Sequence, residues 1–179
     1  INMTKQQWEK QLFSYPEANF LQSWEWGEFH QNLGGKIYRI EIPTTTATKG
    51  LTFCGCFLAI VKNAKRGRYL EIPGGPLLSN YVSLSLWGQA VSLMKAIAIK
   101  EKCVFIRIRP QAENSDQLSA IAKQIGFLPA PMHLHAQLTR ILDLSLPDDA
   151  LLDDFEIPMA ILRHGRRVVL ESRAMVYDV

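Results

Sequence analysis

The segment Leu51–Pro76, LTFCGCFLAIVKNAKRGRYLEIPGGP, decides the fold of this chain. Its first part, up to Lys62, is rich in β-branched and aromatic residues, which predicts a strand that is covered on both faces. A short polar turn over 62–68 leads into a second strand at 69–72. The segment therefore predicts a hairpin, ended by the Gly/Pro-rich turn at 73–76.

Helical patterns flank this hairpin on both sides. Two amphipathic helices precede it, beginning at the capping residues Thr4 and Ser23, and Gly34 ends the second helix. The further elements that the pattern predicts are a strand at 36–43, a polar loop at 44–50, a helix at 82–100, a strand at 104–109, a helix ending at 126, a strand at 134–144 and a short helix at 150–155. This order predicts a mixed α/β (α+β) fold, with helices flanking a layered sheet.

Composition excludes several classes of protein. The chain has 179 residues, of which 47% are hydrophobic and 21% charged, so we expect a globular protein with a substantial core. No apolar run approaches the length of a membrane span, and residues 1–5 do not resemble a secretory signal, so the expected location is cytoplasmic. The three cysteines lie in apolar runs and predict buried thiols rather than metal ligands. No cofactor is expected. The net charge of +3 favours an anionic ligand.

Two motifs are candidates for ligand binding. Arg107 and Arg109 lie two apart in a predicted strand and therefore leave the same face. They either reach solvent beside carboxylates or form a cradle for phosphate or carboxylate. Gly74 and Gly75 either end the preceding strand or line a ligand, because a glycine pair allows close approach.

The second helix and the hairpin turn offer further candidates. We expect the aromatic residues of the helix, Trp24, Trp26 and Phe29, to anchor the core. Glu28 and His30 lie on its more polar side and are candidates for a binding site. The basic residues of the turn either form a solvated hairpin or contact a polyanion; they are Lys62, Lys65, Arg66 and Arg68.

Several segments, in the same order, resemble one known family. Residues 19–29, NFLQSWEWGEF, resemble the N-terminal signature of the Fem-type (FemABX) peptidoglycan-bridge aminoacyltransferases. Residues 69–76 resemble the family's strand and Gly-Pro turn, and 105–110, FIRIRP, resemble its Arg-Ile-Asp-Pro strand with Arg109 in place of the usual Asp. Further similar pieces follow at 126–127, 139–145 and 151–152.

The resemblance implies a fold and a domain division. We expect residues 1–155 to form a GNAT-like (acyl-CoA N-acyltransferase-like) N-terminal subdomain. Residues 156–179 would then be a divergent or truncated basic tail, because the family's central basic motif and second subdomain do not follow Leu152. Apolar residues of this tail are expected either to pack back on the sheet or to mediate self-association.

The resemblance also implies a function. The chain would be the N-terminal part of a tRNA-dependent aminoacyltransferase that adds amino acids to the stem peptide of peptidoglycan precursors, as in cell-wall cross-bridge formation by proteins of the methicillin-resistance type. Its implied partners are an aminoacyl-tRNA and a muramyl-peptide precursor, either UDP-linked or lipid-linked. Family members use a basic residue of the second helix to contact the precursor's phosphates. His30 is the best positional match, and Glu28 remains an alternative.

Two other classes of function stay open. One is a precursor-binding module without catalysis, and the other is a small-molecule GNAT-type N-acyltransferase, although the pyrophosphate loop of those enzymes is absent. No activated nucleophile is recognisable, so catalysis would have to come from positioning and oxyanion stabilisation. We therefore expect the isolated chain to be inactive. Association with a membrane surface and a homo-oligomer formed through the tail also remain open.

Overall fold

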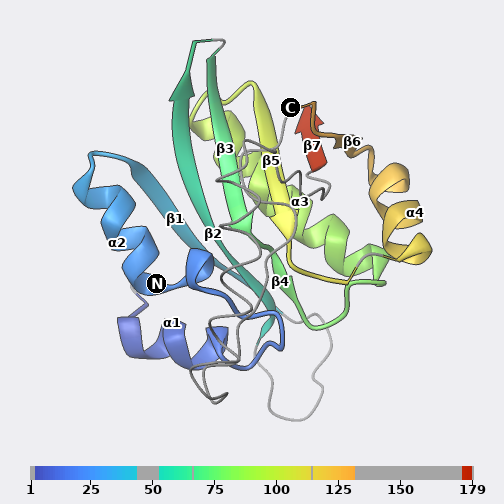
Figure 1. Cartoon of the computed structure of the whole chain (residues 1–179), viewed down its shortest axis with the longest axis horizontal. Helices are drawn as coiled ribbons and strands as arrows, with labels where there is room; N and C mark the ends of the chain where they lie inside the picture. The colour runs from blue at the N-terminus through green and yellow to red at the C-terminus, as the bar shows by residue number, and fades with distance from the viewer. Residues whose placement is uncertain (1–2, 44–52, 66, 114, 132–174, 179) are drawn as a thin grey trace, which may run out of the picture. The chain divides into compact units, whose positions relative to one another are not determined.

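A mixed sheet organises the chain. The computed structural model describes residues 3–43, 53–65, 67–113, 115–131 and 175–178. Within them the strand order is β1-β2-β3-β5-β7-β6, and β4 pairs with β2 (Figure 1). The strands are β1 (Lys36–Pro43), β2 (Phe53–Ala64), β3 (Gly67–Gly74), β4 (Leu77–Leu78), β5 (Phe105–Pro110), β6 (Leu128–Pro129) and β7 (Met175–Asp178). β3 and β5 run parallel, whereas the other pairs are antiparallel.

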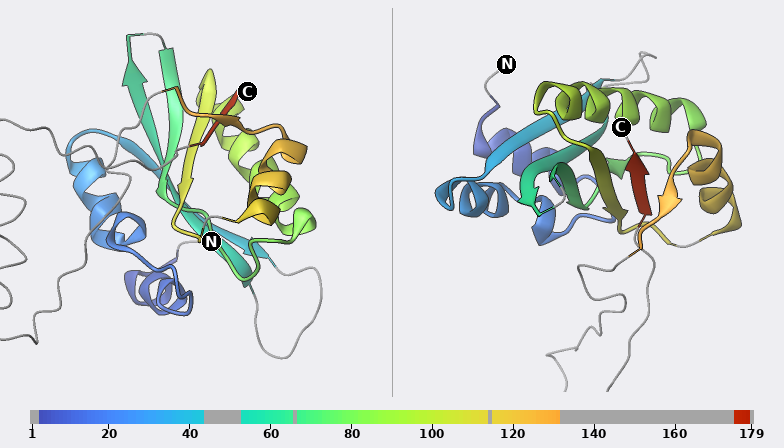
Figure 2. Two further views of the ribbon diagram at one scale, coloured as in Figure 1. Left: turned by 45° about the vertical axis from the view of Figure 1, so that its right-hand side comes forward. Right: turned by 90° about the horizontal axis from the view of Figure 1, so that it is seen from above.

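β2 is buried on both faces, as its apolar run predicts. Successive strand residues point to opposite faces, so alternate residues of β2 enter two separate cores. Phe57 and Ala59 pack in a large core with α3 and α4, and Leu58 and Ile60 pack in a smaller core with α1. The two helix groups accordingly lie on opposite sides of the sheet (Figure 2).

The helices begin and end at the expected signals. They are α1 (Lys5–Leu12), the short 3-10 helix η1 (Phe20–Gln22), α2 (Trp24–Asn32), α3 (Leu84–Lys100) and α4 (Asp116–Ile125). Thr4 and Ser23 cap α1 and α2, each accepting a hydrogen bond at its hydroxyl oxygen from the backbone N–H three residues later. Gly126 ends α4 with a φ of +93°, in the left-handed region that favours glycine.

The hairpin turn is shorter than predicted. β2 continues to Ala64 and β3 begins at Gly67, because the polar residues of the predicted turn pair with one another across the two strands. The short strands β4 and β6 were not predicted, since two residues carry no periodic pattern. β7, in the predicted tail, pairs with β5 and β6 in the sheet.

The fold class is confirmed. Helices flank a mixed sheet, and residues 1–130 with 175–179 form one compact unit. The predicted loop at 44–50, the strand at 134–144, the helix at 150–155 and the domain boundary at 155 lie outside the described residues.

Candidate functional site

One face of the sheet carries a row of polar and charged residues across three strands. Strand register places Lys62 of β2 opposite Tyr69 of β3, and Glu71 of β3 beside Arg107 of β5. Because the side chains alternate, these residues share the face on which α1 and α2 lie, whereas their neighbours in sequence enter the core under α3. The charged row consists of Lys62, Tyr69, Glu71, Arg107 and Arg109, and the apolar Phe105 lies on the same face.

His30 of α2 meets this row at Lys62. The Lys62 Nζ lies 3.3 Å from His30 Nδ1 and 3.8 Å from Glu71 Oε2. Burial and then the charge of Lys62 lower the pKa of His30 below its ordinary value of 6.5, while Glu71 opposes this shift. A neutral His30 accepts a hydrogen bond from the Lys62 ammonium at Nδ1 and carries its proton on Nε2. The positive charge next to α2 therefore comes from the strand residue.

Arg107 and Arg109 leave the same face of β5, as predicted. Arg107 is 9% exposed and lies in register with Glu71, and Arg109 is half-buried in register with Pro73. Burial lowers the pKa of Arg109, yet a guanidinium stays charged at neutral pH. Two cations held close to the sheet can bind a phosphate or a carboxylate.

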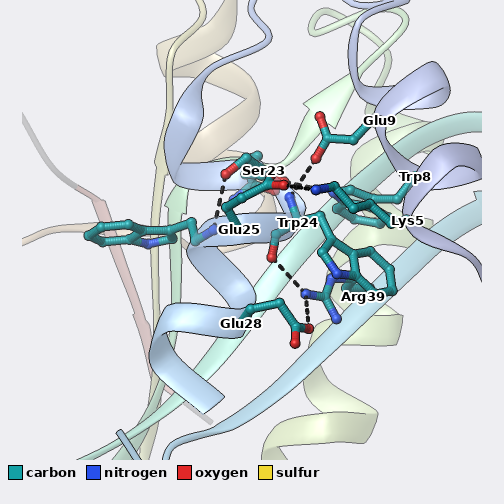
Figure 3. A network of polar contacts seen from close by, with 10 residues as sticks. Lys5, Trp8, Glu9, Ser23, Trp24, Glu25, Glu28 and Arg39 are labelled. Carbon is teal, nitrogen blue, oxygen red and sulfur yellow. Dashed lines mark hydrogen bonds and ion pairs between the residues drawn. The ribbon is translucent and has the colours of Figure 1, made fainter. Parts of the chain in front are cut away.

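Glu28 does not lie with His30. The two residues are about 200° apart around the helix, and Glu28 Oε1 instead pairs with Arg39 Nη2 of β1 at 3.0 Å (Figure 3). The same nitrogen donates to Trp24 O at 2.8 Å, and the guanidinium stacks over the Trp24 ring at 3.6 Å. This arrangement gives Glu28 a structural role, and a substrate contact by Glu28 stays a prediction.

Gly74 and Gly75 are buried beneath residues 19–22, the first part of the motif at 19–29. A Cβ at Gly74, which has a φ of +67°, would meet Asn19 Oδ1 at 2.2 Å, and a Cβ at Gly75 would meet the Gln22 amide at 2.9 Å. Asn19 donates to Gly74 O at 2.8 Å and Gln22 donates to Pro73 O at 2.6 Å. The close packing accounts for both glycines without a ligand, and a ligand contact by them stays a prediction.

The aromatic and basic clusters differ from the expectation. Phe29, predicted to anchor the core, is 50% exposed, because α2 turns that position away from the sheet. Trp24 and Trp26 are partly buried against the smaller core. The basic residues of the predicted turn also contact different parts of the chain. Lys62 faces His30, whereas Arg68 Nη1 donates to Glu101 O at 3.1 Å.

The cysteines offer no activated nucleophile. Burial raises the pKa of all three thiols, that of Cys56 to about 12, so none is a thiolate at neutral pH. Among the described residues, no group of three or more His, Cys, Asp or Glu side chains could hold a metal ion. No helix in the described part of the chain has the length and hydropathy needed to cross a membrane.

Sequence reasoning missed Lys62 and Glu71 as neighbours of His30. The register of the hairpin could have shown that Lys62 and Glu71 are close. Pairing the strands outward from Ala64 and Gly67 places Lys62 opposite Tyr69, and Glu71 is the next residue of β3 on the same face. The contact with His30 could not be found this way, because it depends on how α2 packs against β2.

Comparison with known proteins defines the class of this chain. The fold is a mixed sheet flanked by helices, with charged residues on the face beside α2. A model of the FemAB family matches residues 3–125. The chain belongs to the FemAB family, the Fem-type family of peptidoglycan-bridge aminoacyltransferases that the sequence resemblance indicates. A search of curated proteins finds no match.

A solved structure supports the fold. The crystal structure of FemX is similar to this chain with a TM-score of 0.62 at 21% sequence identity. The similarity covers 78% of this chain and 34% of FemX, so the chain spans about a third of that protein's length.

Proposed function

We propose that this chain is the N-terminal part of a tRNA-dependent aminoacyltransferase that acts on the stem peptide of a peptidoglycan precursor. The observation that carries the proposal is the FemAB family match over residues 3–125. We infer that the chain has a cytoplasmic location and a GNAT-like subdomain that binds the precursor. An aminoacyl-tRNA would be the second substrate.

The charged row is the proposed precursor site. Lys62 supplies a cation beside His30, and Arg107 and Arg109 supply two more on β5. Phosphates and peptide carboxylates of a muramyl-peptide are anions that such a row can bind through charge-assisted hydrogen bonds. His30 contributes its Nε2 proton as a neutral donor next to Lys62.

The reaction requires little covalent chemistry from the protein. The free amine of the stem peptide attacks the aminoacyl ester carbon, an amide C–N bond forms and the ester C–O bond breaks. The tRNA hydroxyl leaves and takes up the proton that the amine loses. Holding the two substrates in place supplies the acceleration.

Titration of the chain with UDP-muramyl-pentapeptide tests the proposal. We expect binding that weakens in the separate variants Lys62→Gln and Arg109→Gln, each by about 1.5 to 3 kcal/mol for a lost charge-assisted contact. Lys102→Gln, which removes an exposed charge at the end of α3, is the matched control and should bind normally. No binding at millimolar ligand, or unchanged affinity in both site variants, would contradict the assignment.

A precursor-binding module without catalysis is the second candidate. The observation that favours it is the coverage of FemX, which is limited to 34% of that chain. Acetyl-coenzyme A, titrated in parallel, distinguishes both candidates from a small-molecule N-acyltransferase, which would bind it in place of the muramyl-peptide.

A further inference from the structure

Glu71 is a buried carboxylate in the middle of the charged row. It is 7% exposed, and its strand, β3, runs between β2, which carries Lys62, and β5, which carries Arg107. The Lys62 Nζ lies 3.8 Å from Glu71 Oε2, and Arg107, 9% exposed, is the register partner of Glu71 on the same face. A carboxylate at this position offsets the repulsion between cations on the two flanking strands.

The ion pair between Lys62 and Glu71 leaves its two charges unequally accessible. The side chain of Lys62 is 29% exposed, whereas that of Glu71 is 10% exposed. An anion that approaches this face therefore meets the ammonium more readily than the carboxylate. The same ammonium lies 3.3 Å from His30 Nδ1. Lys62 is thus held by one residue of α2 and one residue of β3.

Holding a lysine in place favours ligand binding because a lysine side chain has many rotamers. A free lysine loses this rotamer freedom when it binds a ligand, whereas a lysine that is already held loses little. His30 offers the ammonium of Lys62 a neutral acceptor. Glu71 offers it an opposite charge at a buried position, where electrostatic attraction is stronger than in water.

We propose that Glu71 is a positioning residue, which holds the Lys62 ammonium beside His30 in the place where Lys62 binds an anionic ligand. Glu71 acts through Lys62 and does not itself contact the ligand. The inference rests on the proposed function only for the identity of that ligand, because the hold on Lys62 is measurable in the chain without ligand.

The pKa of His30 reports where the Lys62 ammonium lies. The charge of Lys62 lowers this pKa, and Glu71 opposes the shift. The experiment measures, by NMR titration, the rise in the His30 pKa that Lys62→Met causes in the parent chain and in the Glu71→Gln variant. We expect the rise to be at most about half as large in Glu71→Gln, because the ammonium is no longer held beside the ring. Each comparison keeps residue 71 constant, so the direct effect of its charge on His30 cancels.

The same pair of substitutions is then measured with UDP-muramyl-pentapeptide as the ligand. In the parent chain, Lys62→Gln should weaken binding by about tenfold or more. In the Glu71→Gln background the same substitution should weaken binding by about threefold or less. If Glu71 only neutralised Lys62, the opposite would hold, since an unpaired ammonium attracts an anion more strongly.

Glu41→Gln is the matched control. Glu41 is a partly buried carboxylate of β1, and its register partner Cys56 places it on the same face of the sheet. This variant should leave both effects of the Lys62 substitutions unchanged. Glu71→Asp keeps the charge on a shorter side chain and should give intermediate values. It takes the place of Glu71→Gln if thermal unfolding shows that the latter does not fold.

The outcomes separate this inference from the proposed function. A rise in the His30 pKa that is undiminished in Glu71→Gln, or equally diminished in Glu41→Gln, would overturn the positioning role. A loss of ligand binding on Lys62→Gln that is as large or larger in the Glu71→Gln background would also overturn it, while leaving the precursor site in place. If the parent chain does not bind the muramyl-peptide, the proposed function fails and the NMR comparison alone decides the role of Glu71.

Discussion

Gln22 is a fully buried amide that joins three parts of the chain. Its side-chain oxygen accepts from Leu58 N of β2 at 2.7 Å, and its nitrogen donates to Pro73 O of β3 at 2.6 Å. Its backbone oxygen accepts from Trp8 Nε1 of α1 at 2.8 Å. The residue therefore couples the N-terminal motif to the strands that carry Lys62 and Glu71.

Replacing Gln22 by alanine should destabilise the chain strongly. Gln22→Ala leaves a buried N–H and a buried C=O without partners, at about 1 to 3 kcal/mol each. We expect the free energy of unfolding in urea to fall by about 3 kcal/mol. Gln31→Ala, at an exposed position of α2, is the control and should change it little. A loss below about 1 kcal/mol at Gln22 would contradict this role.

The titration of His30 reports its contact with Lys62. In an NMR titration we expect the His30 pKa to lie below 6.5, and to rise toward 6.5 in Lys62→Met, because a neighbouring positive charge is removed. Since the pKa of His30 is lower in the folded state, this shift contributes to the free energy of unfolding in full above pH 6.5. The contribution is lost as the pH falls through the pKa of the folded state. An unchanged His30 pKa in Lys62→Met would show that the two side chains do not meet.

At the scale of elements, Glu101 ties the end of α3 to two strands. It is 3% exposed, and Lys36 Nζ of β1 lies 2.7 Å from Oε1. Tyr38 of β1 donates to the same carboxylate, and Arg68 Nη1 of β3 lies 3.9 Å from Oε2. These contacts lie on the face of the sheet opposite the charged row. They therefore hold β1, β3 and the end of α3 together without involving any residue of the charged row.

This network should appear in the acid stability of the chain. The hydrogen bonds from Lys36 and then Tyr38 lower the pKa of Glu101 below 4.5. A lowered pKa means that the stability is present above pH 4.5 and is lost as the pH falls through the folded value. Urea unfolding at several pH values should therefore show a shallower acid decline for Glu101→Gln than for the parent. Glu113→Gln, at an exposed position, serves as the control; equal slopes for all three proteins would refute the prediction.

At the scale of the whole molecule, we expect the 179-residue chain alone to bind precursor without transferring an aminoacyl group. Catalysis by positioning requires binding surfaces for both substrates, and the chain corresponds to 34% of FemX. A net charge of +3 also gives little general attraction for a tRNA backbone. The assay incubates the chain with charged tRNA and UDP-muramyl-pentapeptide and measures the product by mass. Enzyme-dependent product would contradict the prediction.

The sequence by itself determined the longer helices and strands of the described residues, and the family. Apolar alternation, the capping residues Thr4 and Ser23 and the turn glycines act within a few residues, so their signals are local. The strand spacing also placed Arg107 and Arg109 on one face, because alternation is a property of any strand. The motif at 19–29 indicated the family, which the match over residues 3–125 confirms.

Only the tertiary structure decided which side chains meet. His30 reaches Lys62 while Glu28 pairs with Arg39, because packing against β1 and β2 sets the rotation of α2. The same rotation exposes Phe29, which the sequence pattern places in the core. Gln22 and Gly75 are far apart in sequence and meet through long-range packing. Such contacts depend on strand register and helix rotation, which arise from the summed packing of the whole core and leave no signal within a local window.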